Sequence, residues 1–273
     1  MRDKMVRASA FFSRPPRKIE WTVRNLIEQG TFVVLGGEPK TSKTWAGLEI
    51  ALSVASGTDV FNHYEFTTFR KPRCVFMFLL EDNEDNVQAR MTALAAAKGL
   101  SVEDLTGLPL YLLCREPLDI EEQATEIIRI VQHYHDDPLG GLIIIDPLRN
   151  AHSADENDST SMKRVLSECL RIRNETGFSI IINHHFKKMA AKDQESPGNA
   201  MRGTSSLYGA VDGIIGMRKI QSKERNVWYN NVLCQVKAGP QAEPFGLTLK
   251  VKDGKESGRA VYADWVVEGM FNQ

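Results

Sequence analysis

Short apolar runs alternate with amphipathic segments along most of the chain, from Ile19 to about residue 210. The runs TFVVLGG (31–37), RCVFMFLLED (73–82) and GLIIIDPL (141–148) have the length of strands, and the last is apolar enough to be covered on both faces. Further strands are expected at 108–114 and 178–185, with helices at 43–57, 84–100, 120–135 and 160–177. This alternation predicts an α/β fold with a mostly parallel, twisted sheet and flanking helices.

The pattern changes at both ends of the chain. After about residue 210 the sequence shows strand-like runs: GIIGMRK, VWYNNVLCQVK, FGLTLKV and AVYADWVV. These runs predict a C-terminal set of antiparallel strands. Residues 1–18 contain Pro15-Pro16 and several arginines, and we interpret them as an arm or linker, with residues 19–273 forming one domain.

Composition limits the cellular compartment and the classes of binding partner that we expect. Of the 273 residues, 42% are hydrophobic and 25% charged, and the net charge is −1, so a nucleic-acid site must be a local patch. The four cysteines are scattered without C-x-x-C spacing, which fits buried thiols in a reducing compartment better than disulfides or zinc. The sequence has no long apolar span and no secretory signal, so we expect a cytoplasmic protein without a membrane partner.

The stretch GGEPKTSKTW nearly spells a phosphate-binding loop, G-x-x-x-x-G-K-[ST], and differs from it by a serine at position 42. Such a loop points backbone N–H groups at phosphate from the start of a helix. Lys43 would then reach the β- and γ-phosphates of ATP, and Thr44 would contact Mg²⁺. Gly37 is expected in a tight turn, and Ser42 in a near-helical conformation that needs no positive φ. The residues predicted to bind the nucleotide are Gly37, Glu38, Pro39, Lys40, Thr41, Ser42, Lys43, Thr44 and Trp45.

Two other strands end in carboxylates, which phosphoryl transfer to water requires. Asp146 closes a buried strand and is the candidate Mg²⁺ ligand. Glu81 and Asp82 close another strand and are candidates to activate the attacking water, although they could also cap the next helix. Arg90, on that helix, could form a structural ion pair or support the catalytic carboxylate.

Five segments together resemble the hexameric replicative helicases of the RecA/DnaB superfamily, most of all the small plasmid RepA-type helicases. In chain order they are IEWTVRNLIEQGTFVVLGGEPKTSKTW, VFMFLLEDNEDNVQARMTAL, LIIIDPLRNAH, SIIINHHFKK and RGTSSLYGAVDGII, and the similarity covers about residues 19–250. The resemblance implies a RecA-like P-loop ATPase core that binds ATP and Mg²⁺. The chain departs from the family pattern at two positions. Ser42 replaces the usual glycine of the loop, and Gly239 stands where many relatives carry the arginine of a Lys-x-Arg pair that would begin at Lys237.

The resemblance also implies roles for single residues. It favours Glu81 over Asp82 as the catalytic glutamate, and it makes His184 or His185 the sensor of the γ-phosphate, with His185 our choice for the catalytic set. Arg202 matches an arginine that reaches a neighbouring subunit's nucleotide. Residues 185–203 correspond to a mobile loop that faces the central channel, where three lysines would contact DNA: Lys187, Lys188 and Lys192.

The predicted function is an ATP-dependent, ring-forming DNA helicase or translocase that acts in replication of a plasmid, phage or similar element. Its implied partners are single-stranded DNA, further copies of the chain in a hexameric ring, and a replication initiator or primase. A second hypothesis is a RecA-like ATPase that acts as a switch or loader and binds DNA or a replication partner without unwinding. A small-molecule kinase is disfavoured because no segment resembles an acceptor pocket or a lid.

Overall fold

The computed structural model describes residues 5–15, 18–134, 140–156, 158–186, 205–221, 224–237, 240–255 and 257–271. Within these residues the main sheet has nine strands in the order β11-β10-β9-β8-β3-β7-β6-β4-β5. Its strands are β3 (Phe32–Gly37), β4 (Val75–Leu79), β5 (Leu110–Cys114), β6 (Leu142–Asp146), β7 (Ser179–His185), β8 (Gly213–Ile220), β9 (Val227–Val236), β10 (Phe245–Asp253) and β11 (Ala260–Glu268). A separate small sheet pairs β1 (Trp21–Val23) with β2 (Ile27–Glu28).

The strand directions divide the main sheet into two parts. From β8 to β5, neighbouring strands run parallel, with β3 between β7 and β8. From β8 to β11, neighbours run antiparallel. Parallel strands have their carboxyl ends at one edge, so the ends of β3, β4, β6 and β7 meet there. The predicted fold class, a mostly parallel sheet with C-terminal antiparallel strands, is confirmed.

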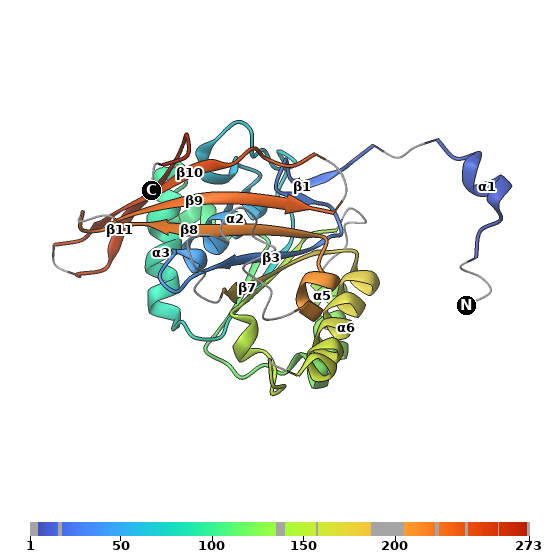
Figure 1. Ribbon diagram of the computed structural model, residues 1–273. Helices are drawn as coiled ribbons and strands as arrows, with labels where there is room; N and C mark the ends of the chain where they lie inside the picture. The colour runs from blue at the N-terminus through green and yellow to red at the C-terminus, as the bar shows by residue number, and fades with distance from the viewer. Residues whose placement is uncertain are drawn as a thin grey trace.

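Helices cover both faces of the sheet (Figure 1). The helices of the described residues are α1 (Ala8–Phe12), α2 (Lys43–Ser56), α3 (Glu84–Ala97), α4 (Val102–Thr106), α5 (Ile120–Tyr134), α6 (Ser159–Thr176) and α8 (Ser205–Ala210), with 3₁₀ turns η2 (Val60–Asn62) and η3 (Leu148–Asn150). Helices α2 and α3 pack on one face with Val33 and Leu35, and α5 and α6 pack on the other with Phe32 and Val34. Because successive side chains of a strand point to opposite faces, β3 contributes to both cores, as its uniformly apolar sequence predicts.

Local signals in the sequence set the ends of several helices. Helix α2 stops at Gly57, whose φ of 74° is left-handed, and α6 begins after Asp158, whose side chain accepts hydrogen bonds from the N–H groups of Thr160 and Ser161. The observed elements lie within a few residues of the expected ranges. One difference concerns the site: β4 ends at Leu79, so Glu81 and Asp82 lie beyond the strand rather than within it.

A buried ion pair joins the helix of the phosphate loop to the end of α3. Lys98 Nζ lies 2.7 Å from Glu49 Oε1, with the two side chains only 1% and 2% exposed. Glu49 also accepts the N–H of Phe61, and Lys98 donates to the carbonyl of Asp59. Burial raises the pKa of the Glu49 carboxyl, and the neighbouring Lys98 ammonium opposes that shift. The pair therefore ties α2, α3 and the η2 turn together.

The N-terminal helix α1 lies apart from the sheet (Figure 1). None of its residues is buried, and Phe11 and Phe12 are 60% and 83% exposed. The division into an arm of residues 1–18 and a domain of residues 19–273 stays a prediction. No helix in the described ranges combines the length and apolar character that crossing a bilayer would require.

Candidate nucleotide-binding site

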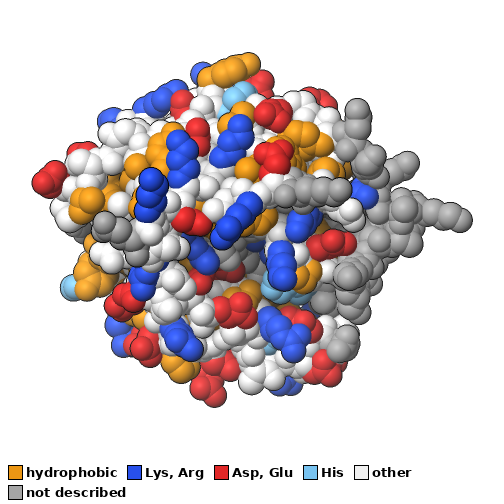
Figure 2. All heavy atoms as spheres, turned by 90° about the vertical axis from the view of Figure 1, so that its left-hand side faces the viewer, with side chains coloured by type: hydrophobic (Ala, Val, Ile, Leu, Met, Phe, Trp, Pro, Cys, Tyr) orange, Lys and Arg blue, Asp and Glu red, His pale blue; other side chains and the backbone are white. Residues whose placement is uncertain are grey.

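A pocket of about 500 Å³ lies at the carboxyl edge of the parallel strands. Figure 2 shows a face of the molecule on which Lys and Arg side chains gather around a hollow, with acidic side chains between them. The lining residues come from the loop after β3, the start of helix α2, the ends of β4, β6 and β7, helix α3, and strands β8 and β9. They are Lys40, Thr41, Ser42, Lys43, Thr44, Trp45, Glu81, Asp82, Arg90, Asp146, Pro147, Asn183, His185, Lys219 and Trp228.

The Lys43 ammonium lies inside the turn of the loop. It donates to the carbonyls of Gly37 and Glu38, both at 2.9 Å, and to Thr41 Oγ1 at 3.3 Å. The side chain is buried, and burial lowers the pKa of Lys43 to about 8 although the Asp146 and Glu38 carboxylates favour its charged form. Incoming phosphate would add negative charge and thereby stabilise the ammonium.

The loop has free backbone donors around this ammonium. Among the described hydrogen bonds, none is donated by the N–H groups of Lys40, Thr41 or Ser42. The side chain of Ser42 does not cap α2, so the N–H groups at the start of that helix also lack a side-chain acceptor. Such N–H groups, at the positive end of a helix dipole, are suited to bind phosphate oxygens.

The expectation that Ser42 is near-helical is wrong. Ser42 has φ 60° and ψ 27°, in the left-handed region, and Lys40 also has a positive φ of 66°. The chain must turn sharply between β3 and α2, and the residue directly before the helix takes the left-handed conformation. This conformation costs a residue with a Cβ roughly 1–2 kcal/mol. The usual motif therefore has glycine at this position because glycine adopts the left-handed conformation without this cost.

Gly37 is needed for a different reason from the one expected. It is the last residue of β3 and has no positive φ. A Cβ atom there would lie 2.4 Å from the carbonyl oxygen of Met217 on β8 and 2.9 Å from Thr41 Oγ1. Real Cβ atoms essentially never approach other atoms so closely. Close packing of the loop against β8, rather than a tight turn, therefore requires glycine at position 37.

Asp146 and Thr44 suit a magnesium ion. Asp146 is 8% exposed, and its Oδ2 is buried without a hydrogen-bond partner in the described part of the chain. Burial raises the pKa of the Asp146 carboxyl; Asn183 and Thr44 lie close enough to oppose the shift, but neither reaches Oδ2 in hydrogen-bond geometry. Mg²⁺ is held in proteins by one or two carboxylates together with phosphate oxygens and water. This unpaired oxygen beside a threonine hydroxyl fits that ligand set.

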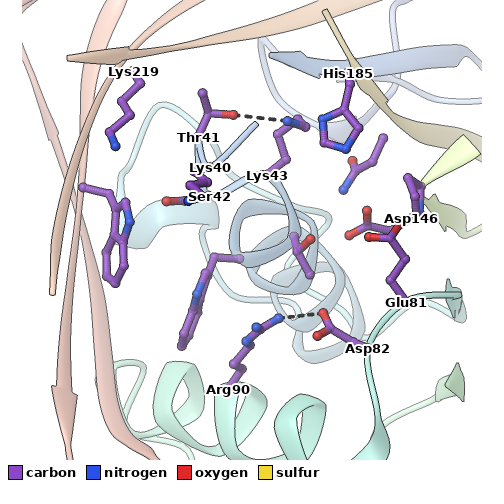
Figure 3. A pocket seen from close by; sticks show the side chains of 15 residues that line it. Lys40, Thr41, Ser42, Lys43, Glu81, Asp82, Arg90, Asp146, His185 and Lys219 are labelled. Atoms are coloured by element: carbon purple, nitrogen blue, oxygen red, sulfur yellow. Dashed lines mark hydrogen bonds and ion pairs between the residues drawn. The ribbon is translucent and has the colours of Figure 1, made fainter. Parts of the chain in front are cut away.

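The two carboxylates after β4 have different surroundings. Asp82 Oδ2 lies 2.6 Å from Arg90 Nη1, and the Arg90 guanidinium also lies 5.5 Å from the centre of the Trp45 ring. Glu81 is exposed and has no ion pair or hydrogen bond within the described ranges. Figure 3 shows Glu81 and Asp146 pointing into the same side of the pocket, with Asp82 turned towards Arg90. The geometry thus leaves Glu81 available to a reacting group, and it gives Arg90 its ion pair with Asp82.

The two adjacent histidines point to opposite faces of β7. His185 lines the pocket (Figure 3), whereas His184 is buried with the Glu156 carboxylate and the His152 ring nearby. Burial lowers the pKa of His185, the Lys43 ammonium lowers it further, and the Glu81 carboxylate opposes both. Of the two candidates, His185 is the one placed where it could contact a phosphate.

Sequence reasoning missed four lining residues: Pro147, Asn183, Lys219 and Trp228. Asn183 is fully buried, and both its amide oxygen and its amide nitrogen lack partners among the described residues. A signal for it existed, because period-two alternation puts Asn183 on the same face of the strand as His185. Lys219 and Trp228 come from the C-terminal strands, and no motif marks them. Four predicted site residues lie outside the described ranges: Lys187, Lys188, Lys192 and Arg202.

The profile of the AAA domain family AAA_25 matches residues 2–191, more than two thirds of the 273-residue chain. The chain belongs to this family of AAA domains. The matched range of this AAA domain contains the phosphate loop, Glu81, Asp146 and His185. The predicted assignment as an ATPase domain is thereby confirmed.

Two solved structures have a similar fold. One is described as an ATPase domain; it aligns with a TM-score of 0.54 and 13% identity, over 86% of this chain and 85% of that one. The other is a DnaB-like replicative helicase, solved in a study of its interactions with primase, and it aligns with a TM-score of 0.56 and 14% identity. That alignment covers 86% of this chain and 57% of the helicase chain, so this chain spans little more than half of the helicase. At such identities the likeness establishes the fold.

Proposed function

We propose that the chain is the ATP-driven motor of a ring-forming DNA helicase or translocase that acts in replication of a plasmid, phage or similar element. One observation supports this most: a single pocket contains the phosphate loop, Asp146, Glu81 and His185, at the carboxyl edge of a RecA-like sheet. Chains that share this fold include a solved ATPase domain and a DnaB-like replicative helicase.

The proposed mechanism assigns each group a task. Backbone N–H groups of the loop and the Lys43 ammonium bind the β- and γ-phosphates of ATP. Thr44 and the unpaired oxygen of Asp146 would hold Mg²⁺, which neutralises charge that develops on the phosphates. Glu81 orients the attacking water and accepts its proton. His185, neutral at pH 7 because its pKa is lowered, donates a hydrogen bond to the γ-phosphate and reports its loss after hydrolysis.

The remaining parts of the proposal rest on the sequence resemblance. Arg202 would reach the ATP bound by a neighbouring subunit, which makes a hexameric ring necessary for fast hydrolysis. Lys187, Lys188 and Lys192 would contact phosphates of single-stranded DNA in the channel of that ring. A replication initiator or primase would recruit the ring to its site of action, and the cytoplasm is the compartment we propose.

Unwinding of a forked duplex by the purified chain, with ATP and Mg²⁺, tests the proposal. We expect single-stranded DNA to stimulate hydrolysis and the fork to be separated. Changing Lys187, Lys188 and Lys192 together to alanine should weaken DNA binding and flatten its dependence on salt, because fewer counterions are released. Basal hydrolysis should survive in that variant. Hydrolysis that single-stranded DNA stimulates without any unwinding would favour the second hypothesis, a switch or loader. The structural observation that favours this hypothesis is the left-handed conformation of Ser42 in the phosphate loop.

A further inference from the structure

The pocket extends well beyond the groups that would bind phosphate. The catalytic end is fixed by Lys43, Asp146 and Glu81. Figure 3 shows Lys219 on the other side of the phosphate loop from Asp146 and Glu81. The wall at this far end consists of Lys219 from β8 and Trp228 from β9. Both ends belong to one pocket, and the nucleoside of a bound nucleoside triphosphate lies away from the γ-phosphate.

Strand register places Lys219 and Trp228 on one face of the sheet. Lys219 pairs directly with Asn230, and directly paired residues point to the same face. Trp228 precedes Asn230 by two residues, so it shares that face as well. This is the face covered by α2, because Met217 and Val232 on the same strands belong to the core around that helix. The C-terminal strands therefore direct an indole and an ammonium towards the start of the loop helix.

Trp228 also differs from the other indole of the pocket in what it contacts. Trp45, which directly follows Thr44, has the Arg90 guanidinium over its ring. Trp228 is partly exposed, packs one side against the core, and makes no ring–ring or cation–π contact within the described ranges. Lys219 is exposed and has no ion-pair partner there. An open aromatic surface beside an unpaired cation suits a planar base attached to a polyanion.

We propose that Trp228 stacks on the nucleobase of the bound nucleotide, with Lys219 on the same wall adding positive charge near the phosphates. The proposal rests on the proposed function, because it takes the phosphate loop to fix the triphosphate. It makes the C-terminal antiparallel strands part of the nucleotide site. Stacking is tolerant of base identity, so this subsite accepts nucleotides with any base and selects nucleotides over bare polyphosphates.

Binding of ATP and of inorganic tripolyphosphate, each with Mg²⁺, separates the two ends of the site. By calorimetry, Trp228→Ala should weaken ATP binding by about tenfold or more, the usual size of a base–aromatic stack. Tripolyphosphate should bind this variant as it binds the unmodified chain. Trp228→Phe, which keeps an aromatic face, should retain most of the ATP affinity. Trp265→Phe is the matched control, because Trp265 is 3% exposed and does not line the pocket.

Tryptophan fluorescence gives a second readout that a purely structural role would not move. ATP should quench the emission of the Trp45→Phe variant, and tripolyphosphate should not. The quenching by ATP should vanish in the double variant Trp45→Phe/Trp228→Phe. If Trp228→Ala proves unstable, Trp228→Leu fills the volume without a π-face. Equal ATP affinities for Trp228→Leu and the unmodified chain would overturn the proposal.

The failures of the two proposals are distinguishable. If the unmodified chain binds tripolyphosphate but Trp228 variants bind ATP normally, the phosphate loop stands and the stacking proposal falls. If the unmodified chain binds neither ligand, both fall. Lys43→Ala should lose affinity for both ATP and tripolyphosphate. This variant therefore shows the result expected when phosphate binding itself is lost.

Discussion

The Arg90 guanidinium lies 2.6 Å from the Asp82 carboxylate, whereas the adjacent Glu81 has no such partner within the described ranges. Two neighbouring carboxylates are thereby given different roles. An ion-paired carboxylate is held in place, while an unpaired one can turn towards a water molecule.

Glu81→Gln should therefore reduce ATP turnover by about a hundredfold or more, the usual contribution of a positioned general base. ATP binding should remain nearly normal. Asp82→Asn should reduce turnover far less, through a looser Arg90 and Trp45. Steady-state hydrolysis together with equilibrium ATP binding checks both variants, and a larger turnover loss in Asp82→Asn than in Glu81→Gln would reverse the assignment.

The lowered pKa of Lys43 predicts proton uptake when ATP binds. The free protein loses this proton around pH 8, because burial lowers the pKa to about 8 from 10.5. Bound triphosphate stabilises the ammonium and raises that pKa, so above pH 8 binding takes up a proton and ATP affinity falls by up to about tenfold per pH unit. Calorimetry at pH 9 in buffers of different ionisation enthalpy measures the uptake. Lys43→Ala should show neither the uptake nor hydrolysis, and a pH-independent affinity in the unmodified chain would contradict this prediction.

The left-handed backbone at Ser42 predicts that Ser42→Gly raises the free energy of unfolding by about 1 kcal/mol, since glycine adopts this conformation without strain. ATP turnover should stay intact or rise. Ser42→Ala is the control, because it removes the hydroxyl and keeps the strain. Urea unfolding and steady-state hydrolysis test the pair. A large loss of turnover in both variants would show that the hydroxyl itself has a function.

Breaking the buried Glu49–Lys98 pair should destabilise the protein strongly. Lys98→Met leaves the Glu49 carboxylate buried without its cation, at a cost of about 3–5 kcal/mol, and Glu49→Gln should act in the same direction. The double variant should be more stable than the sum of the single losses predicts, because neither charge is then left alone. Urea unfolding of all four proteins completes the cycle. Additive losses would show that the two charges do not stabilise one another.

The proposed role of Arg202 predicts complementation between two inactive variants. A guanidinium supplied by a neighbouring subunit contributes roughly a thousandfold or more to turnover, so Arg202→Ala should bind ATP and hydrolyse it very slowly. Mixed with Glu81→Gln, it should form some interfaces that have both Glu81 and Arg202, and hydrolysis should partly return. A mixture that stays inactive despite confirmed mixed assembly would rule out a role across the interface.

The sequence predicted the sheet, most of the helices and the phosphate loop, because these features depend on local patterns. Uniform apolar runs identify buried parallel strands, and Gly57 and Asp158 end and begin helices by chemistry that is visible in one dimension. Ser42 was misjudged because its conformation depends on how the chain passes from β3 into α2. Trp228 and Lys219 were missed because only the pairing of β8 with β3 brings the C-terminal strands to the pocket.

That pairing limits how far the protein can be shortened. The family match ends at residue 191, yet the strand that leads into the phosphate loop is hydrogen-bonded to β8, which begins at Gly213. A protein shortened to the matched range would leave β3 at an open sheet edge, where unpaired peptide groups recruit strands from other molecules. Residues 2–191 therefore lack the strand that completes the sheet beside the phosphate loop, and we expect them not to fold as a separate unit.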